Sequence, residues 1–267
     1  MAVVMLRDTF PCGSVLFLFF GSKHITSSSL VDLSGEKSEK IKDIILFYYL
    51  ITMEQVMEQV NTYVNLLEPC HLAEIFGTFI FLSGILNANG PNATLKLSAA
   101  LTLSAFIIGD ISGGHMNPAV SSMFYLQGKQ NQAAHSKLMW YASCQVVGGL
   151  LAHTVHTLLN GLPGRNCYSP GHKYSHNLVS ACIAEFVGTI IFFIGILSNG
   201  GNMFVVGLSL YIAANIAGGV SGGHLNPAVT FMMLVRGEID IIRASGFIAC
   251  QLMGAFCTLQ LHAKLHE

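Results

Sequence analysis

Hydrophobic residues fill long stretches of the chain, and polar residues gather in the short segments between them. A helix of about 20 apolar residues crosses the roughly 30 Å hydrocarbon layer of a bilayer. Two apolar segments, 117–126 and 226–235, would be only about 15 Å long as helices, or half a membrane. Six stretches are long enough to span: 70–88, 95–111, 136–159, 178–198, 203–219 and 242–262. The pattern predicts an all-α membrane protein with six transmembrane helices and two half-length helices.

Composition agrees with a membrane protein and excludes several other classes. Of 267 residues, 52% are hydrophobic and 10% are charged, and the mean hydropathy is +0.57. Such a chain has too little polar surface for a soluble globule, so we expect a lipid bilayer around it. The net charge of −1 offers no basic field for nucleic acid. The seven cysteines lie far apart without a Cys-x-x-Cys pair, so neither a metal site nor a disulfide framework is expected.

One nine-residue phrase occurs twice, as SGGHMNPAV at Ser112–Val120 and as SGGHLNPAV at Ser221–Val229. The similarity extends further, because an AExxGT stretch at Ala73–Thr78 returns at Ala184–Thr189. A unit of three spans and one half-helix is therefore present twice. Because three is odd, the second unit must enter the bilayer from the opposite side, which makes an inverted repeat.

This repeat sets the predicted domain organisation. Repeat one covers 70–159 and repeat two covers 178–262, and together they form a membrane domain over 70–267. Residues 1–69 form an N-terminal extension outside the repeat.

The half-helices are predicted to be re-entrant and to meet near the membrane midplane. Asn117 and Asn226 are favoured helix N-caps, and Pro118 and Pro227 suit the first helical position. Non-helical backbone at that depth must line a polar cavity or be wrapped by protein, because lipid cannot satisfy its polar groups. The backbone in question belongs to Gly113, Gly114, His115, Gly222, Gly223 and His224.

These features together resemble the aquaporin (major intrinsic protein) family over essentially all of residues 70–262. The resemblance implies a passive pore in each subunit for water or small neutral solutes, usually within a homotetramer and without a cofactor. Opposed positive helix ends at the pore centre would exclude ions. The two Asn-Pro-Ala boxes that would form this centre are Asn117, Pro118, Ala119, Asn226, Pro227 and Ala228.

The predicted selectivity filter departs from the water-selective members of that family. Aligned from the boxes, it consists of Leu97, Ala214, Gly223 and Val229, and Val229 stands where those members have an arginine. Such a filter is wide, apolar and uncharged. It is similar to the filters of unorthodox aquaporins, which pass glycerol, ammonia or hydrogen peroxide. Gly223 also stands where many water channels have a pore cysteine, so weak block by mercurials is expected.

Several polar residues admit both a structural and a functional interpretation. Glu74 and Glu185 lie within spans and could relay protons, but the resemblance implies that they accept hydrogen bonds from the loop backbone. His115 and His224 lack a second ligand at metal spacing, so packing within the loops is expected instead of metal binding. Close helix crossing is the role expected of Gly77, Gly84, Gly148, Gly188, Gly195 and Gly254.

The N-terminal extension is interpreted as nonessential or as a gene-model artefact, since Met53 could itself start a chain. Cys12–Phe20 is an apolar run that superficially resembles a signal peptide but is too short to span. Ser27–Lys42 is polar and expected to be disordered. An amphipathic helix is predicted after it, lying on the membrane surface or packed on the channel mouth. Its apolar face holds Met53, Val56, Met57, Val60, Val64 and Leu67.

The sequence leaves the orientation in the membrane open. The family's topology has both termini in the cytoplasm, and lysine and arginine counts in the loops do not support it. The glycosylation acceptor Asn92-Ala93-Thr94 favours it, because that topology makes the loop with this acceptor external. The plasma membrane is expected rather than an intracellular membrane.

Two other functions remain open. A secondary transporter also uses inverted repeats and broken helices, but its midplane charges could only be Glu74 and Glu185. A poorly permeable structural membrane protein is the second alternative. An enzyme is not expected, because no Ser/His or Cys/His arrangement for an intramembrane hydrolase is evident from spacing.

Overall fold

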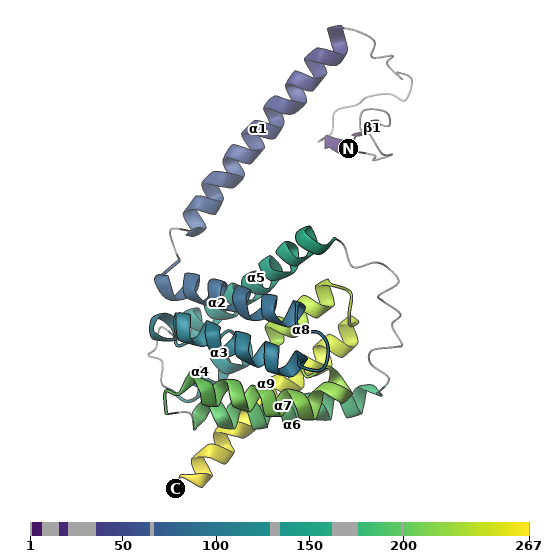
Figure 1. Ribbon diagram of the computed structural model, residues 1–267. Helices are drawn as coiled ribbons and strands as arrows, with labels where there is room; N and C mark the ends of the chain where they lie inside the picture. Colours follow the sequence, from purple (N-terminus) through teal and green to yellow (C-terminus); the bar gives the residue numbers. More distant parts are fainter. Residues whose placement is uncertain are drawn as a thin grey trace. The chain divides into compact units, whose positions relative to one another are not determined.

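The computed structural model divides the chain into two compact units, Met1–Tyr63 and Val64–Glu267 (Figure 1). Each unit has its own internal packing. The residues that the structure describes are 2–6, 16–20, 36–64, 67–128, 134–161, 176–198 and 200–266.

Unit 1 contains two short strands and one long helix. Strand β1 (Ala2–Leu6) pairs antiparallel with β2 (Leu16–Phe20), and Ala2 lies opposite Phe20. The apolar run that resembled a signal peptide therefore ends in a strand, while its first residues, 12–15, lie outside the described part of the chain.

Helix α1 (Glu36–Val64) contains the predicted amphipathic segment from Met53 to Val64 but begins earlier than expected, and Leu67 lies after its end. The predicted disorder of Ser27–Lys42 is wrong from Glu36 onward, and residues 27–35 lie outside the described part. Residues 36–42 are rich in glutamate and lysine. Glutamate and lysine are good helix formers, so a polar composition alone did not indicate disorder here.

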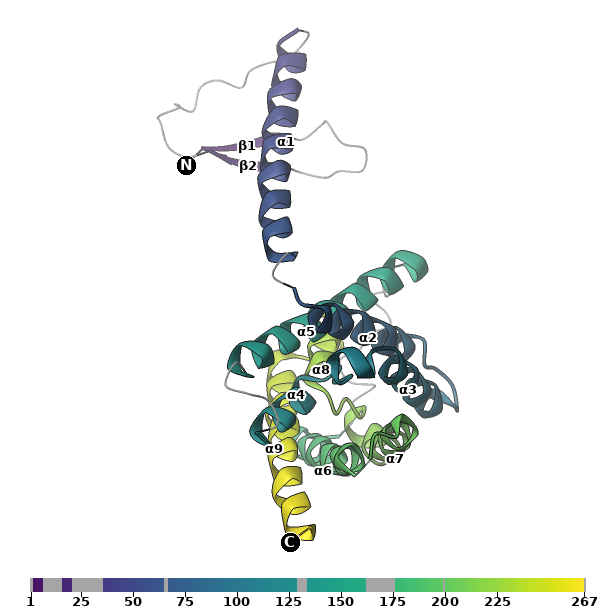
Figure 2. The same cartoon turned by 90° about the vertical axis from the view of Figure 1, so that its left-hand side faces the viewer.

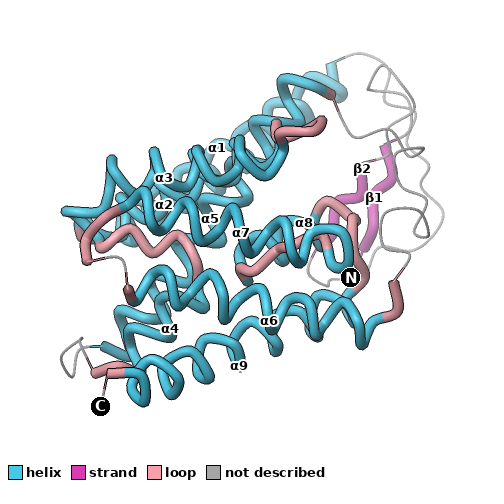
Figure 3. The backbone as a smooth tube through the Cα atoms, turned by 60° about the horizontal axis from the view of Figure 1, so that its bottom comes forward, coloured by secondary structure: helices cyan, strands magenta, loops and turns pink. Residues whose placement is uncertain are grey.

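The described residues of unit 2 form eight α-helices, and strands occur only in unit 1 of the described chain (Figure 3). The predicted all-α membrane fold is confirmed for this unit. Five of its helices are long and apolar enough to cross a membrane, and a sixth, α5, is 27 residues long but more polar. The helices are α2 (Pro69–Leu86), α3 (Ala93–Ser112), α4 (Pro118–Leu126), α5 (Ala134–Asn160), α6 (Leu178–Leu197), α7 (Met203–Ser221), α8 (Pro227–Val235) and α9 (Ile241–Leu265).

The eight helices pack as two matched halves. Helix α2 packs against α3 and α5, and α6 packs in the same way against α7 and α9, while α3 and α7 join the halves. The short helices α4 and α8 contact α5 and α9 and touch each other (Figure 2). The half-helices are therefore wrapped by longer helices, which supply the partners that lipid cannot.

Glycines allow the closest of these crossings, as the sequence predicted. A Cβ atom on Gly148 of α5 would meet the Ile75 carbonyl oxygen and would lie 3.0 Å from the Thr78 Cβ of α2. In the second half, a Cβ atom on Gly254 would lie 2.9 Å from the Thr189 Cβ of α6. Because backbone cannot yield as a flexible side chain does, these two positions require glycine.

Replacement of Gly148 by alanine is expected to destabilise unit 2 by about 1–3 kcal/mol, because the added methyl group overpacks the crossing of α5 on α2. Gly219→Ala is the matched control, since a Cβ atom at Gly219 would meet nothing within 4 Å. The thermal unfolding midpoints of the purified variants in detergent measure the difference. Equal midpoints for the two variants would contradict the assigned crossing.

Candidate functional site

Each of two pore loops leaves a long helix through a pair of glycines. We call Gly113–Met116 the first pore loop and Gly222–Leu225 the second. Gly113 and Gly222 end α3 and α7 with a φ of 90°, and Gly114 and Gly223 follow with a φ of 63° and 62°. Only glycine adopts such left-handed backbone at little cost, which explains the Gly-Gly pair in both copies of the repeated phrase.

Two larger residues share this left-handed conformation. Met116 has a φ of 49° and Leu225 a φ of 52°, and both side chains are fully buried. This backbone is costly for residues with a side chain, so it persists only where the surroundings fix it. The contacts of the loop N–H and C=O groups show how it is fixed.

A buried carboxylate holds the first pore loop. Glu74 of α2 is 0% exposed, and its Oε1 accepts hydrogen bonds from the Ser112 Oγ at 2.7 Å and the His115 N–H at 2.9 Å. Its Oε2 accepts from the Met116 N–H and from the Gln145 Nε2, both at 2.7 Å. Four donors therefore surround the carboxylate, and two of them are loop backbone groups that lipid could not satisfy.

The second pore loop has the same arrangement around Glu185 of α6. Its Oε1 accepts from the Ser221 Oγ at 2.6 Å and the His224 N–H at 2.8 Å. Its Oε2 accepts from the Leu225 N–H and from the Gln251 Nε2, both at 2.7 Å. With all four contacts repeated, each glutamate works as an anchor for a loop, and a carboxylate fixed in this way is poorly suited to relay protons.

The half-helices begin at the predicted asparagine caps. The Asn117 Oδ1 accepts from the Ala119 N–H at 2.9 Å, and the Asn226 Oδ1 accepts from the Ala228 N–H at 2.8 Å. In both boxes the proline that follows the cap occupies the first helical position. Both Asn-Pro-Ala boxes are thus helix starts, with the positive ends of α4 and α8 at the asparagines.

The asparagines also join the two loops to each other. The Asn117 Nδ2 donates to the Leu225 carbonyl at 2.9 Å, and the Asn226 Nδ2 donates to the Met116 carbonyl at 2.9 Å. Sequence reasoning identified the asparagines as helix caps and missed this bond between the loops. An amide nitrogen carries two N–H groups, so one of each pair is used between the loops.

The pore histidines pack within the loops. The His115 Nδ1 lies 3.0 Å from the Ser121 Oγ, and the His224 Nδ1 lies 3.1 Å from the Thr230 Oγ1. His115 and Ser121 therefore form a buried Ser/His pair, which their spacing in the sequence did not reveal. The Ser121 hydroxyl also accepts from the Gln145 Nε2 at 2.9 Å. In the second copy the equivalent contact is made by Thr230 instead of a serine. Either hydroxyl can make this bond between a pore loop and a half-helix, so a structural role fits both copies.

Neither pore histidine belongs to the group of described side chains that could hold a metal. That group consists of Glu68, Cys70 and His71, whose ligand atoms lie within 4.8 Å of one another. Glu68 and His71 already bond to each other as a capping box at the start of α2, and the Glu68 N–H donates to the His71 Nδ1 at 3.0 Å. A metal would have to compete with this cap.

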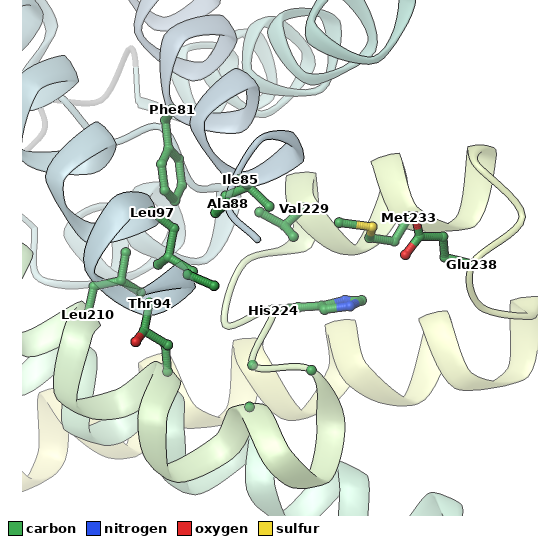
Figure 4. A pocket seen from close by; sticks show the side chains of 15 residues that line it. Phe81, Ile85, Ala88, Thr94, Leu97, Leu210, His224, Val229, Met233 and Glu238 are labelled. Atoms are coloured by element: carbon green, nitrogen blue, oxygen red, sulfur yellow. The ribbon is translucent and has the colours of Figure 1, made fainter. Parts of the chain in front are cut away.

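A cavity of about 350 Å³ lies beside the second pore loop (Figure 4). We call it the larger cavity, in contrast to a smaller one beside the first pore loop. All four predicted filter residues, Leu97, Ala214, Gly223 and Val229, are among the residues that line it. They come from α3, α7, the second pore loop and α8, so the fold brings together positions that are far apart in sequence. Gly222 and His224 of the loop also line this cavity.

A smaller cavity of about 60 Å³ lies beside the first pore loop. The predicted pore-loop residues Gly113, Gly114 and His115 line it. Val120 lines it at the position that Val229 occupies in the larger cavity. The two cavities are therefore built from equivalent parts of the inverted repeat.

The larger cavity also contains a charged residue that sequence reasoning missed. Glu238 follows α8 and lines the cavity, and its Oε1 accepts from the Arg236 Nε at 3.0 Å. The side chains of Arg236 and Glu238 are 10% and 12% exposed. Burial raises the pKa of the Glu238 carboxyl and lowers the pKa of the Arg236 guanidinium, because each charged form loses hydration. The Arg236 Nη1 also contacts the His153 Nδ1 at 3.2 Å.

Glu185→Gln is expected to destabilise the protein by at least about 2 kcal/mol, because a carboxamide turns an N–H group toward donors and leaves buried loop groups unsatisfied. The control is the same exchange at Glu54, which is exposed on α1. Thermal unfolding in detergent measures both. An unfolding midpoint for Glu185→Gln that equals the control value would show that the carboxylate does not hold the loop.

The geometry agrees with comparisons to known proteins. A family model described as Major intrinsic protein matches residues 12–203 and 175–266. Aquaporin TIP2-1 of Zea mays is 36% identical over 105 residues, so the match spans 33% of this chain and 42% of that protein. Aquaporin NIP1-1 of Zea mays is 30% identical over 191 residues, which are 64% of this chain and 66% of that protein.

A solved structure has the same fold. The X-ray structure of the aquaglyceroporin from Plasmodium falciparum matches with a TM-score of 0.60 over 72% of this chain and 93% of that chain, at 19% sequence identity. The paired boxes, the inverted helices and the match of the family model to most of the sequence lead to one conclusion. The chain belongs to the major intrinsic protein family.

Proposed function

We propose that this protein is a passive channel for water and other small neutral solutes. The observation that carries the proposal is the placement of two cavities beside two cross-linked pore loops, with the four uncharged filter positions in the wall of the larger cavity. A secondary transporter is not favoured. Glu74 and Glu185, the midplane charges it would need, already accept four hydrogen bonds each.

Ion exclusion is proposed to come from the half-helices. The N-termini of α4 and α8 approach each other at the cross-linked asparagines, and each carries about half a positive charge. A cation or hydronium ion at this point would meet two positive ends in a narrow passage. A neutral solute would accept a hydrogen bond from the remaining asparagine N–H groups and would feel no such barrier.

The solute range is proposed to be broader than water alone. Leu97, Ala214, Gly223 and Val229 supply no charge and little bulk to the larger cavity. Two of them have minimal side chains, so a carbon-containing solute meets apolar walls and loop carbonyls. Glycerol, ammonia and hydrogen peroxide fit this environment, and the solved structure with the same fold is that of an aquaglyceroporin.

A homotetramer is proposed from the family's usual assembly, and the plasma membrane is proposed as its location. A non-enzymatic role is proposed because the buried His115 and Ser121 bond to each other between the first pore loop and α4. The glycosylation acceptor Asn92 lies at the start of α3, in the connection that follows α2, and supports an external position for that connection.

Val229→Arg is expected to lower the ratio of glycerol flux to water flux by about tenfold, because an arginine at this wall adds bulk and raises the barrier for glycerol by about 1.4 kcal/mol. Val235→Arg, at the exposed end of α8, is the matched control. Stopped-flow light scattering of proteoliposomes with water, glycerol, ammonia and peroxide gives the ratios. Wild-type protein that passes water alone would contradict the broad solute range, and no flux at all would contradict the channel.

Mercurials are expected to leave most of the water flux intact, because none of the described cysteines lines either cavity. Ala214→Cys should make the channel sensitive, since Ala214 lines the larger cavity within a regular helix. Water flux with and without mercuric chloride tests both statements. Strong block of the wild-type protein would place a cysteine in the lumen.

A further inference from the structure

The two cavities differ in volume and also in the charge of the residues that line them. Among the described residues that line the larger cavity, Glu238 is the one with a formal charge. The described residues that line the smaller cavity carry none. At an offset of 109 positions, Arg236 corresponds to Gln127, and Glu238 corresponds to Lys129, which lies outside the described residues. The inverted repeat is therefore broken at one mouth of the pore by a carboxylate.

The backbone around Glu238 is fixed in place. Helix α8 ends in a Schellman motif, in which the Glu238 N–H donates to the Met233 carbonyl at 2.8 Å and the Gly237 N–H donates to the Leu234 carbonyl at 2.9 Å. Gly237 has the left-handed φ of 73° that this motif needs. The carboxylate is then held from the side by the Arg236 Nε at 3.0 Å. Glu238 is thus presented to the cavity by a rigid turn.

Glu238 lies at the mouth of the larger cavity. Val229 and Met233 lie one turn apart on the face of α8 that lines the cavity, and Glu238 follows at the surface end of this half-helix. Figure 4 shows Glu238 beside Met233 at one end of the cavity, with Phe81 and Leu97 at the other and His224 between.

The field at this mouth favours a cation. The Glu238 carboxylate presents a negative charge to the cavity. The Arg236 guanidinium, which is not among the described residues that line the cavity, offsets this charge from the side, and the C-terminal end of α8 adds about half a negative charge. Apolar walls from Phe81, Leu97, Val229 and Met233 lower the local dielectric and strengthen the attraction. The Arg236 contact itself shows that this carboxylate pairs with a guanidinium group.

We propose that Glu238 makes the mouth of the larger cavity a binding site for small organic cations of the ammonium and guanidinium class. This inference rests on the proposed function as a channel. A bound cation donates its N–H groups to the Glu238 carboxylate and stays at the mouth, since the positive ends of α4 and α8 bar it from the centre. It plugs the pore, while the uncharged form of the same amine passes.

Guanidinium chloride is the probe, because guanidinium keeps its charge throughout the accessible pH range and the cavity of about 350 Å³ has room for it. Water efflux from proteoliposomes is measured by stopped-flow at increasing guanidinium, against sodium chloride of equal ionic strength and osmolarity. The half-blocking concentration is taken relative to each variant's own unblocked flux. The wild-type protein should show saturable block by guanidinium and none by sodium.

Glu238→Gln should raise the half-blocking concentration by about tenfold, since the variant keeps the size of the side chain but loses its charge. Glu238→Asp keeps the charge and should keep the block. The double variant Arg236→Gln/Glu238→Gln removes both charges, avoids leaving a buried arginine alone, and should also lose the block. Glu58→Gln, the same exchange on exposed α1, is the matched control and should behave as wild type.

Equal block of wild type, Glu238→Gln and the double variant would overturn the proposal, as would a wild-type channel that guanidinium does not block. Either result would leave the channel itself intact. Absence of water and solute flux in the wild-type protein would instead overturn the proposed function. If Glu238→Gln fails to fold, the comparison of Glu238→Asp with the double variant decides the question.

Discussion

The buried glutamates Glu74 and Glu185 make the architecture of the pore possible. Two stretches of non-helical backbone lie among the membrane helices, where lipid offers no partner for their N–H groups. Each glutamate accepts two of these N–H groups together with a hydroxyl and a glutamine amide. Burial of a charge is costly, but four donors with good geometry offset that cost. The same contacts fix the left-handed residues Met116 and Leu225, whose carbonyls would otherwise have no defined direction.

The asparagines turn two anchored loops into one unit. Each caps its own half-helix and also bonds the carbonyl of the left-handed residue in the opposite loop. A displacement of one loop would therefore break a bond of the other. Because α4 and α8 also pack on both α5 and α9, the opposed helix ends cannot separate without disturbing both halves of the repeat. The pore centre is rigid for this reason, and rigidity is what a dipole barrier against ions needs.

Most of unit 2 could be predicted because its signals are local or duplicated. Apolar runs of spanning length indicated the long helices, and Asn-Pro-Ala indicated two helix starts that the structure contains. Alignment of the copies also identified four positions that the fold brings to one cavity. The second bond of each asparagine and the roles of Gln145 and Gln251 could not be predicted, because they depend on contacts between distant helices. The matching glutamines were visible in the sequence, but duplication alone does not say what a residue touches.

Duplication and its exceptions carry different information about function. Contacts that occur in both halves, such as those of the glutamates and asparagines, are required by the fold whatever solute passes. Positions that differ between the halves are free of this constraint, so selection for a particular solute or ligand acts there. Glu238 is such a position, because the residue 109 positions earlier is Lys129. This chain has Val229 instead of an arginine at the filter. Its charged pair, Arg236 and Glu238, lies about two helical turns further toward the mouth of the cavity. Charge placed there acts on what enters the cavity and not on the narrow centre, which leaves the transit of uncharged molecules to the filter and the asparagines.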